Sequence, residues 1–326
     1  MIEVRNPERE IHRLRVRLGI AWALVLVCFG ILGARFFYLQ VVRYPAFHAQ
    51  AEDNRIALVP VPPRRGLIYD RNGVLLADNV PDYTLEIAPG QVENVERTID
   101  DLAQVIEIGP GDRRRFRRLL EDSRNYDSVP IRTRLSDEEL ARFAAIRYRF
   151  PGVEIRARLF RTYPLGETAS HVVGYIGRIS QADKRRLEEH ELLSEYAGTT
   201  HIGKIGVEQS YEEKLHGRAG VEQVEVSAGG RTGRSLSRTP PVAGSNLVLS
   251  IDVRLQQLAE EWFGDRRGAL VAIEPKTGDV VAFVSKPLFD PNLFVDGIDV
   301  PTWQALNEDP DKPLLNRPLR GTYPPG

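Results

Sequence analysis

The sequence is poor in the side chains that form covalent cross-links and metal clusters. Its 326 residues include one cysteine, Cys28, and six histidines. One cysteine cannot form a disulfide within the chain or supply a thiolate cluster for a metal. The histidines, which show no His-x-x-x-His or glutamate-flanked zinc spacing, stand at positions 12, 48, 171, 190, 201 and 216. We therefore expect no bound metal and no cofactor.

The sequence also lacks an excess of charge of either sign. The 44 basic and 45 acidic residues leave a formal net charge of −1, which argues against a nucleic-acid partner. Only six of the basic residues are lysines, a bias that we attribute to genome composition and not to phosphate binding. The arginines at 114, 115, 117 and 118 lie among acidic residues and predict a solvated helix face.

Enough apolar sequence is present to build hydrophobic cores. Hydrophobic residues make up 42% of the chain and charged residues 27%, so the composition is that of a folded protein. The length allows two or three domains of ~100–200 residues each. A change in composition at Ser237–Gly244, which includes Pro240 and Pro241, predicts a boundary near residue 240.

An uncharged stretch near the amino terminus predicts a membrane anchor. Residues 18–34 carry no charge, and arginines precede them at 5, 9, 13, 15 and 17. The apolar run reaches residue 42 if Arg35 extends its charge to the interface. A cleaved signal peptide and a buried core helix are the alternatives, but no Ala-x-Ala cleavage site follows. We expect an anchor at 18–42, a cytoplasmic tail at 1–17 and the remainder beyond the membrane.

Residues 43–240 show the mixed pattern of an α+β domain. An Asn72-Gly73 turn predicts a hairpin over 66–77, and alternating residues predict strands at 83–87 and 221–226. Capping residues Ser136 and Ser180 predict two helix starts. Further helices are predicted over 101–108, 113–121 and 206–215.

Residues 241–326 have the pattern of the beginning of an α/β domain. We expect a strand at 246–251, a helix capped by Asp252, and strands at 269–273 and 280–284. Leu255, Leu258, Ala259 and Trp262 predict the face of that helix that packs on a core. Because two long strands and one helix cannot bury both faces of a sheet, we expect this domain to be truncated.

Several motifs resemble the class B penicillin-binding proteins. Those that resemble their non-catalytic pedestal domain are Arg65–Gly73, Ser170–Gly177 and Gly203–Gly217. Those that narrow the resemblance to the penicillin-binding protein 2 subfamily are Val221–Val226 with Gly230-Arg231, Phe289–Gly297, and Asn316-Arg317 with Tyr323–Gly326. The septal class B proteins are the second choice. The resemblance covers essentially the whole chain, in order.

The resemblance implies a fold, an activity and a set of partners. The fold is one transmembrane helix, a pedestal of the dimerisation type and an incomplete transpeptidase domain. The activity is that of a serine-type D-Ala-D-Ala transpeptidase or carboxypeptidase of the bacterial inner membrane, which cross-links peptidoglycan stem peptides during elongation and shape maintenance. β-Lactams are the implied inhibitors. A SEDS-type glycan polymerase and other elongation proteins are the implied partners.

The chain departs from the family at its catalytic motifs. No Ser-x-x-Lys occurs in it, and the resemblance places that motif immediately after Gly326, so we expect no catalytic residue in this chain and no acylation by it. Lys276-Thr277-Gly278 and Ser123-Arg124-Asn125 spell the other two motifs. Both precede the first motif, and we interpret them as turn and loop sequences. A non-catalytic scaffold that binds the polymerase remains the alternative function.

Overall fold

The computed structural model describes residues 7–44, 56–121, 128–226 and 232–322. The chain divides into two compact units, Met1–Ala57 and Leu58–Gly326. Three sequence features lie outside the described residues: Ser123-Arg124-Asn125, Gly230-Arg231 and Tyr323–Gly326.

The first unit is dominated by one long helix. Helix α1 (Pro7–Phe37) continues into a π-helical turn, η1 (Tyr38–Val42). Residues Arg15–Val42 are long and apolar enough to cross a membrane, with a mean hydropathy of 2.2 over the most apolar window. No residue of that window is buried within the protein. The predicted anchor at 18–42 is therefore helical, and none of the residues in its most apolar window is buried by the parts of the chain that the structure describes.

The second unit combines small sheets with short helices. Within the described residues, the strand orders are β1-β9-β10, β12-β2-β3-β4 with β5 paired to β3, β6-β7, β8-β11 and β13-β14. The strands are β1 (Ile56–Val61), β2 (Ile68–Tyr69), β3 (Leu75–Ile87), β4 (Val129–Arg132), β5 (Val153–Thr162), β6 (Ile176–Arg178), β7 (His201–Gly203), β8 (Gly217–Arg218), β9 (Gly220–Val226), β10 (Thr232–Thr239), β11 (Val242–Ala243), β12 (Leu247–Val248), β13 (Gly268–Ile273) and β14 (Val280–Lys286). The helices are η2 (Pro89–Gln91), α3 (Val95–Leu102), α4 (Pro110–Glu121), α5 (Asp137–Ile146), η3 (Arg147–Arg149), α6 (Ser170–Val173), α7 (Gln181–Glu189), α8 (Gly206–Ser210), α9 (Glu212–His216), α10 (Val253–Phe263), α11 (Asn292–Val295), α12 (Val300–Glu308) and α13 (Arg317–Arg320).

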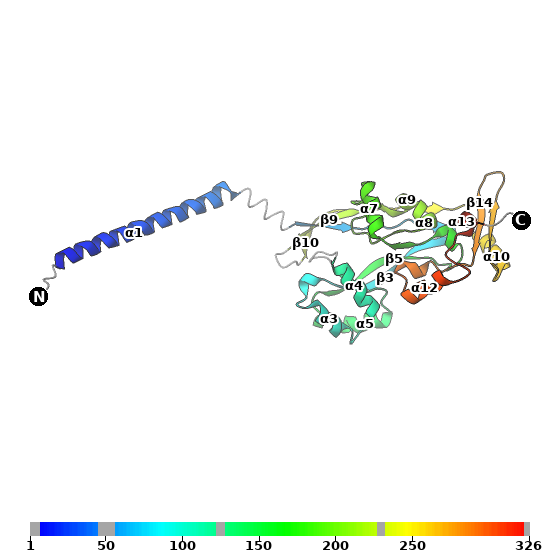
Figure 1. Cartoon of the computed structure of the whole chain (residues 1–326), viewed down its shortest axis with the longest axis horizontal. Coiled ribbons are helices and arrows are strands. Elements are labelled where there is room, and N and C mark those ends of the chain that lie inside the picture. Colours follow the sequence, from blue (N-terminus) through cyan, green and yellow to red (C-terminus); the bar gives the residue numbers. More distant parts are fainter. Residues whose placement is uncertain (1–6, 45–55, 122–127, 227–231, 323–326) are drawn as a thin grey trace. The chain divides into compact units, whose positions relative to one another are not determined.

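Strand β3 organises the pedestal. It pairs antiparallel with β2, β4 and β5, and β5 follows it in register from Asp78↔Thr162 to Ile87↔Val153. The predicted hairpin at Asn72-Gly73 is confirmed, because Gly73 has a φ of 83° at the turn between β2 and β3. Figure 1 shows β3 and β5 running side by side, with α3, α4 and α5 gathered near one end of the pair.

Helices α3, α4 and α5 cover one face of this end of the sheet. Fully buried residues of the resulting head core include Leu85, Ile131, Phe116 and Phe143. The capping box predicted at Ser136 is confirmed, since the Ser136 side chain accepts a hydrogen bond from the backbone N–H of Glu139. The helix predicted at 113–121 is confirmed as α4, and that at Ser180 as α7.

Two helix predictions in the pedestal were wrong in their bounds. The helix expected over 101–108 is α3, which begins at Val95 because the Asn94 side chain caps it by accepting from the N–H of Arg97. The helix expected over 206–215 is broken at Tyr211, whose φ and ψ of −113° and 24° are not helical, and it becomes α8 and α9.

The face that α10 buries also differs from the prediction. Asp252 caps the helix as expected, but Leu255, Leu258 and Trp262 are exposed. Ala259 is buried as predicted, and Val253, Gln256 and Glu260 are the other buried residues of the helix. These polar side chains are buried because they bond to backbone groups, as described below. The strand expected at 246–251 is shorter, since only β12 forms, parallel to β2. Strands β13 and β14 form at the predicted positions, and the structure shows that they pair antiparallel.

Candidate functional site

Four charged side chains meet in the interior of the pedestal. Arg65 lies just before β2, Arg161 is on β5, and Glu208 and Glu212 are on α8 and α9. The Glu208 carboxylate accepts from Nε of Arg161 at 2.7 Å and from Nε of Arg65 at 2.7 Å. Arg65 also donates from Nη1 and Nη2 to Glu212, at 3.1 and 2.5 Å. We call these four residues the Arg65 network.

Further hydrogen bonds connect the network to the surrounding backbone. Arg161 donates from Nη1 to the carbonyl of Gly66 at 2.8 Å. The hydroxyl of Tyr163 donates to Glu208 at 3.2 Å and accepts from the N–H of Ile176 at 2.9 Å. The network therefore joins segments that are as many as 147 residues apart in the sequence.

The network lies in a nearly water-free environment. The side chains of Arg161 and Glu208 are 1% and 0% exposed. Burial alone would raise the pKa of Glu208, but the adjacent Arg65 and Arg161 guanidinium groups lower it below its ordinary value. Burial likewise opposes the charge of Arg65, but Glu208 and Glu212 raise its pKa. Both partners are therefore held in their charged forms.

Sequence reasoning missed this network. Arg65 and Glu208 lie inside the motifs that carried the family resemblance, but no periodic pattern shows that they are partners. One signal was available, since the segment that contains Glu208 has conspicuous glycines. A Cβ on Gly203 would lie 2.1 Å from the carbonyl oxygen of Glu208, so close backbone packing explains this glycine.

A second group of polar contacts joins the pedestal to the elements after residue 245. Asp70 in the β2–β3 turn accepts from the N–H of Val253 at 3.1 Å, at the first turn of α10. The Asn292 side chain accepts from the N–H of Tyr163 at 2.9 Å and donates to its carbonyl at 3.0 Å. This pair of bonds imitates the pairing of a strand with the end of β5.

The buried face of α10 completes this junction. Gln256 accepts from the N–H of Phe283 at 2.7 Å and donates to its carbonyl at 2.9 Å, which ties α10 to β14. Glu260 accepts from the N–H of Ala169 at 3.0 Å, which ties α10 to the pedestal. Burial raises the pKa of Glu260 above its ordinary value. Directed hydrogen bonds therefore fix the register between the two parts, beside a shared apolar cluster to which Val253 and Val295 contribute.

Of the two segments that spell catalytic motifs, only Lys276-Thr277-Gly278 lies within the described residues. Lys276-Thr277-Gly278 lies in the connection between β13 and β14, as expected. The Thr277 hydroxyl accepts from the N–H of Asp279 at 3.2 Å, and Gly278 has a φ of 79°, so both residues serve the turn. Ser123-Arg124-Asn125 lies outside the described residues.

Of the arginines predicted to lie on a solvated helix face, Arg114, Arg117 and Arg118 are exposed on α4. Arg115 departs from the prediction, because its side chain is 18% exposed and pairs with Asp112. Arg113 donates to Asp100 at 2.6 Å, and Arg117 donates to Glu96 at 2.9 Å. Among the described residues, no group of three or more His, Cys, Asp or Glu side chains is placed to hold a metal ion.

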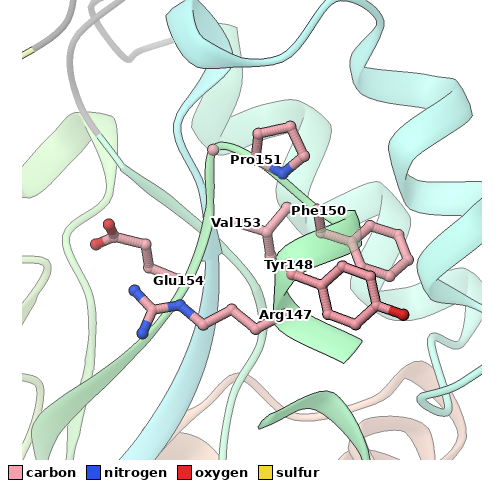
Figure 2. A pocket seen from close by; sticks show the side chains of 7 residues that line it. Arg147, Tyr148, Phe150, Pro151, Val153 and Glu154 are labelled. Atoms are coloured by element: carbon pink, nitrogen blue, oxygen red, sulfur yellow. The ribbon is translucent and has the colours of Figure 1, made fainter. Parts of the chain in front are cut away.

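A shallow surface pocket of about 370 Å³ lies where η3 leads into β5. Figure 2 shows its lining side chains, among them Arg147, Tyr148, Phe150 and Glu154. Tyr148 is 83% exposed, and the lining contains no serine, cysteine or histidine. The pocket therefore offers a contact surface and lacks a side chain for nucleophilic catalysis by those groups.

Comparison with known families shows two ordered matches. Residues 60–249 match the penicillin-binding protein dimerisation domain, and residues 268–326 match the penicillin-binding protein transpeptidase domain. The chain is 43% identical to the peptidoglycan D,D-transpeptidase MrdA of Acinetobacter baumannii over 99% of its length. It is 44% identical to that of Escherichia coli K12 over 95%. The chain spans about half of these curated relatives, 48% and 49%.

Solved structures of penicillin-binding proteins also match this chain. The structure of the complex between PBP2 and MreC from Helicobacter pylori matches with a TM-score of 0.65 and 27% identity, over 80% of this chain and 48% of that one. Pseudomonas aeruginosa PBP2 in complex with WCK 5153 matches with a TM-score of 0.52 and 35% identity, over 83% of this chain and 39% of that one.

Neutralising Glu208 tests the Arg65 network. We expect Glu208→Gln to lower the free energy of unfolding by about 3–5 kcal/mol, because it leaves two buried arginines without their shared carboxylate. Chemical denaturation at neutral pH measures the change. The matched control is Glu213→Gln, an exposed residue of the same segment, which we expect to change stability by less than about 0.5 kcal/mol. Equal losses of stability from the two substitutions would contradict the stabilising role of Glu208 in the Arg65 network.

Burial of His171 predicts a loss of stability in acid. The ring is 3% exposed, its Nε2 lies 3.4 Å from the carbonyl of Pro287, and burial lowers its pKa to about 4. An unfolded histidine binds its proton near pH 6.5, whereas the folded His171 binds it only near pH 4. The contribution of the neutral His171 ring to the free energy of unfolding is therefore complete above pH 6.5 and is lost between pH 6.5 and 4. We expect this residue to give the free energy of unfolding a slope of up to ~1.4 kcal/mol per pH unit in that range.

Denaturation curves collected between pH 7.5 and 4.5 measure this slope. We expect His171→Gln to reduce this slope without abolishing it, since burial also lowers the pKa values of His201 and His216. We expect His190→Gln, at an exposed position, to leave the slope unchanged. A slope that is the same in all three proteins would show that His171 takes up its proton in the folded state.

Proposed function

The chain belongs to the penicillin-binding protein family, and from this premise we propose that it forms the amino-terminal half of a peptidoglycan D,D-transpeptidase of the elongation type. The observation that carries the proposal is the order of the two family matches, dimerisation domain and then transpeptidase domain, in a chain 43–44% identical to MrdA proteins. The sequence-based expectation of a penicillin-binding protein 2 relative is thereby confirmed at the level of family and fold.

We assign each part of the chain a role in that protein. Residues 1–17 form a cytoplasmic tail, and 18–42 form a single-pass anchor in the bacterial inner membrane. Residues 43–240 form the pedestal in the periplasm, and 241–326 begin the transpeptidase domain. The apolar surface of α1 supports the anchor, and the arginines before it support this orientation.

The proposed reaction is an acyl transfer in two steps. A serine of a Ser-x-x-Lys motif, expected after Gly326, attacks the carbonyl between the two terminal D-alanines of a stem peptide and releases D-alanine. The neighbouring lysine accepts the serine proton. An amine of a second stem peptide then attacks the acyl-serine and forms the cross-link. β-Lactams acylate the same serine.

The pedestal is the proposed contact surface for protein partners. A structural neighbour of this chain, PBP2 of Helicobacter pylori, forms a complex with MreC. We propose that an MreC-type protein and a SEDS-type glycan polymerase contact this chain. A non-catalytic scaffold is the less favoured alternative, because residues 268–326 match the transpeptidase domain and a scaffold has no use for it.

Penicillin labelling tests the proposal. We expect the whole gene product, isolated from its native membranes, to be labelled by a fluorescent penicillin at a mass above 36.7 kDa. An antibody against residues 60–240 identifies the band. A polypeptide of residues 1–326 should remain unlabelled, because it contains no Ser-x-x-Lys.

Two other results would contradict this account. Labelling of the 326-residue polypeptide would reveal a nucleophile within it. A whole gene product that carries the epitope and takes up no penicillin would favour the scaffold.

A further inference from the structure

The segment before α13 is held by bonds to backbone carbonyls. Arg317 is 6% exposed, and its guanidinium donates to the carbonyls of Lys312 at 3.2 Å, Leu315 at 3.5 Å and Asp311. Lys312 has a φ of 44°, which is uncommon for a residue with a side chain. The guanidinium therefore fixes a tight turn immediately before α13.

A single hydroxyl connects this segment to β14. Ser285 is 1% exposed, and its hydroxyl donates to the carbonyl of Leu315 at 3.0 Å and accepts from the N–H of Arg317 at 3.1 Å. Because one group satisfies a donor and an acceptor two residues apart, it fixes both the position and the direction of the backbone there.

Asn316 connects the same segment to the pedestal. Its Oδ1 accepts from the N–H of Leu319 at 3.3 Å and caps α13. Its Nδ2 donates to the carbonyl of His171 at 3.3 Å. The Oδ1 atom thus caps α13 and the Nδ2 atom binds the pedestal, so a substitution can remove one bond and keep the other.

Helix α6 is the common support on the pedestal side. Ala169, which precedes it, donates its N–H to Glu260 of α10, and the His171 ring contacts the Pro287 carbonyl after β14. The edge of that ring also packs on Phe289, with centroids 5.0 Å apart. Residues 315–317 are therefore connected to the pedestal directly, and also through β14 and α10.

We propose that Ser285 and Asn316 are positioning residues for the acylation step. They fix residues 315–317 against β14 and α6, so the backbone that leads toward the expected nucleophile starts from a fixed position. The inference depends on the proposed function, which expects the serine shortly after that segment. A small displacement of a reacting group is sufficient to slow chemistry by up to about 100-fold, so these distant bonds affect the acylation rate.

The decisive variant is Asn316→Asp in the whole gene product. A carboxylate retains the acceptor that caps α13, and its charge suits a helix start, but it cannot donate to the His171 carbonyl. Ser285→Ala is the second variant and removes both bonds to β14. The matched control is Asp299→Ala, which removes the cap of α12, a bond to the N–H of Thr302, and neither contact of residues 315–317 described above.

Stopped-flow acylation by a fluorescent penicillin gives the rate at saturation and the dissociation constant of the non-covalent complex. We expect both variants to lower the saturating rate about tenfold or more, with the dissociation constant unchanged. We expect Asn316→Asp to melt within a few degrees of the wild-type protein and the control to acylate at the wild-type rate.

The outcomes separate the two claims. Wild-type rates in both variants, or losses that match the fraction of unfolded protein, would overturn the positioning role and leave the proposed function intact. A wild-type protein that forms no acyl-enzyme would overturn the proposed function, and the inference with it.

Discussion

The pedestal depends on a single carboxylate, that of Glu208, placed between two arginines in its interior. Taking a carboxylate and a guanidinium out of water is costly, and their attraction offsets that cost only when the geometry is good and the other polar atoms find partners. Here Glu208 bonds to Arg65, Arg161 and Tyr163, each at 2.7–3.2 Å. Three segments, around residues 65, 161–163 and 208–212, must therefore fold together before all of these charges are satisfied. We infer that the network selects one arrangement of the pedestal over other compact ones.

Buried polar side chains with specific partners also form the junction between the pedestal and the part that matches the transpeptidase domain. Asp70, Asn292, Gln256 and Glu260 each bond to backbone groups of another element. Backbone groups have fixed positions, so such bonds specify register more sharply than apolar contact, which tolerates sliding. The pedestal in this account is a support that determines where the catalytic part begins.

Local chemistry made part of this fold predictable. Asn72-Gly73 requires a tight turn, and Ser136 with Glu139 satisfies a helix start within four residues, so both features follow from neighbours in the sequence. The buried face of α10 did not follow, because Gln256 and Glu260 are ranked as solvent-facing by any hydrophobic pattern. Their partners, Phe283 and Ala169, become neighbours only in the folded chain. The start of α3 was missed for a simpler reason, since asparagines such as Asn94 mark turns as often as helix caps.

The family could be identified from motifs, whereas the Arg65 network could not. Arg65 and Glu208 are 143 residues apart, and no pattern in either segment indicates that the two side chains are partners. The residues that resemble the family are therefore informative about function, and the structure adds that several of them are engaged in ion pairs in the pedestal. Resemblance alone did not distinguish a residue that contacts substrate from one that holds the pedestal together.

Native-state hydrogen exchange tests most directly whether the Arg65 network makes the pedestal one cooperative unit. The informative amides are those of Gly66, bonded to the Leu215 carbonyl, Ile176, bonded to the Tyr163 hydroxyl, and Lys204, bonded to the Tyr175 carbonyl. Our account predicts that all three exchange with one common free energy, equal to that of global unfolding. Exchange of any of them through a separate local opening, at a much lower free energy than the amides of the head core, would contradict it.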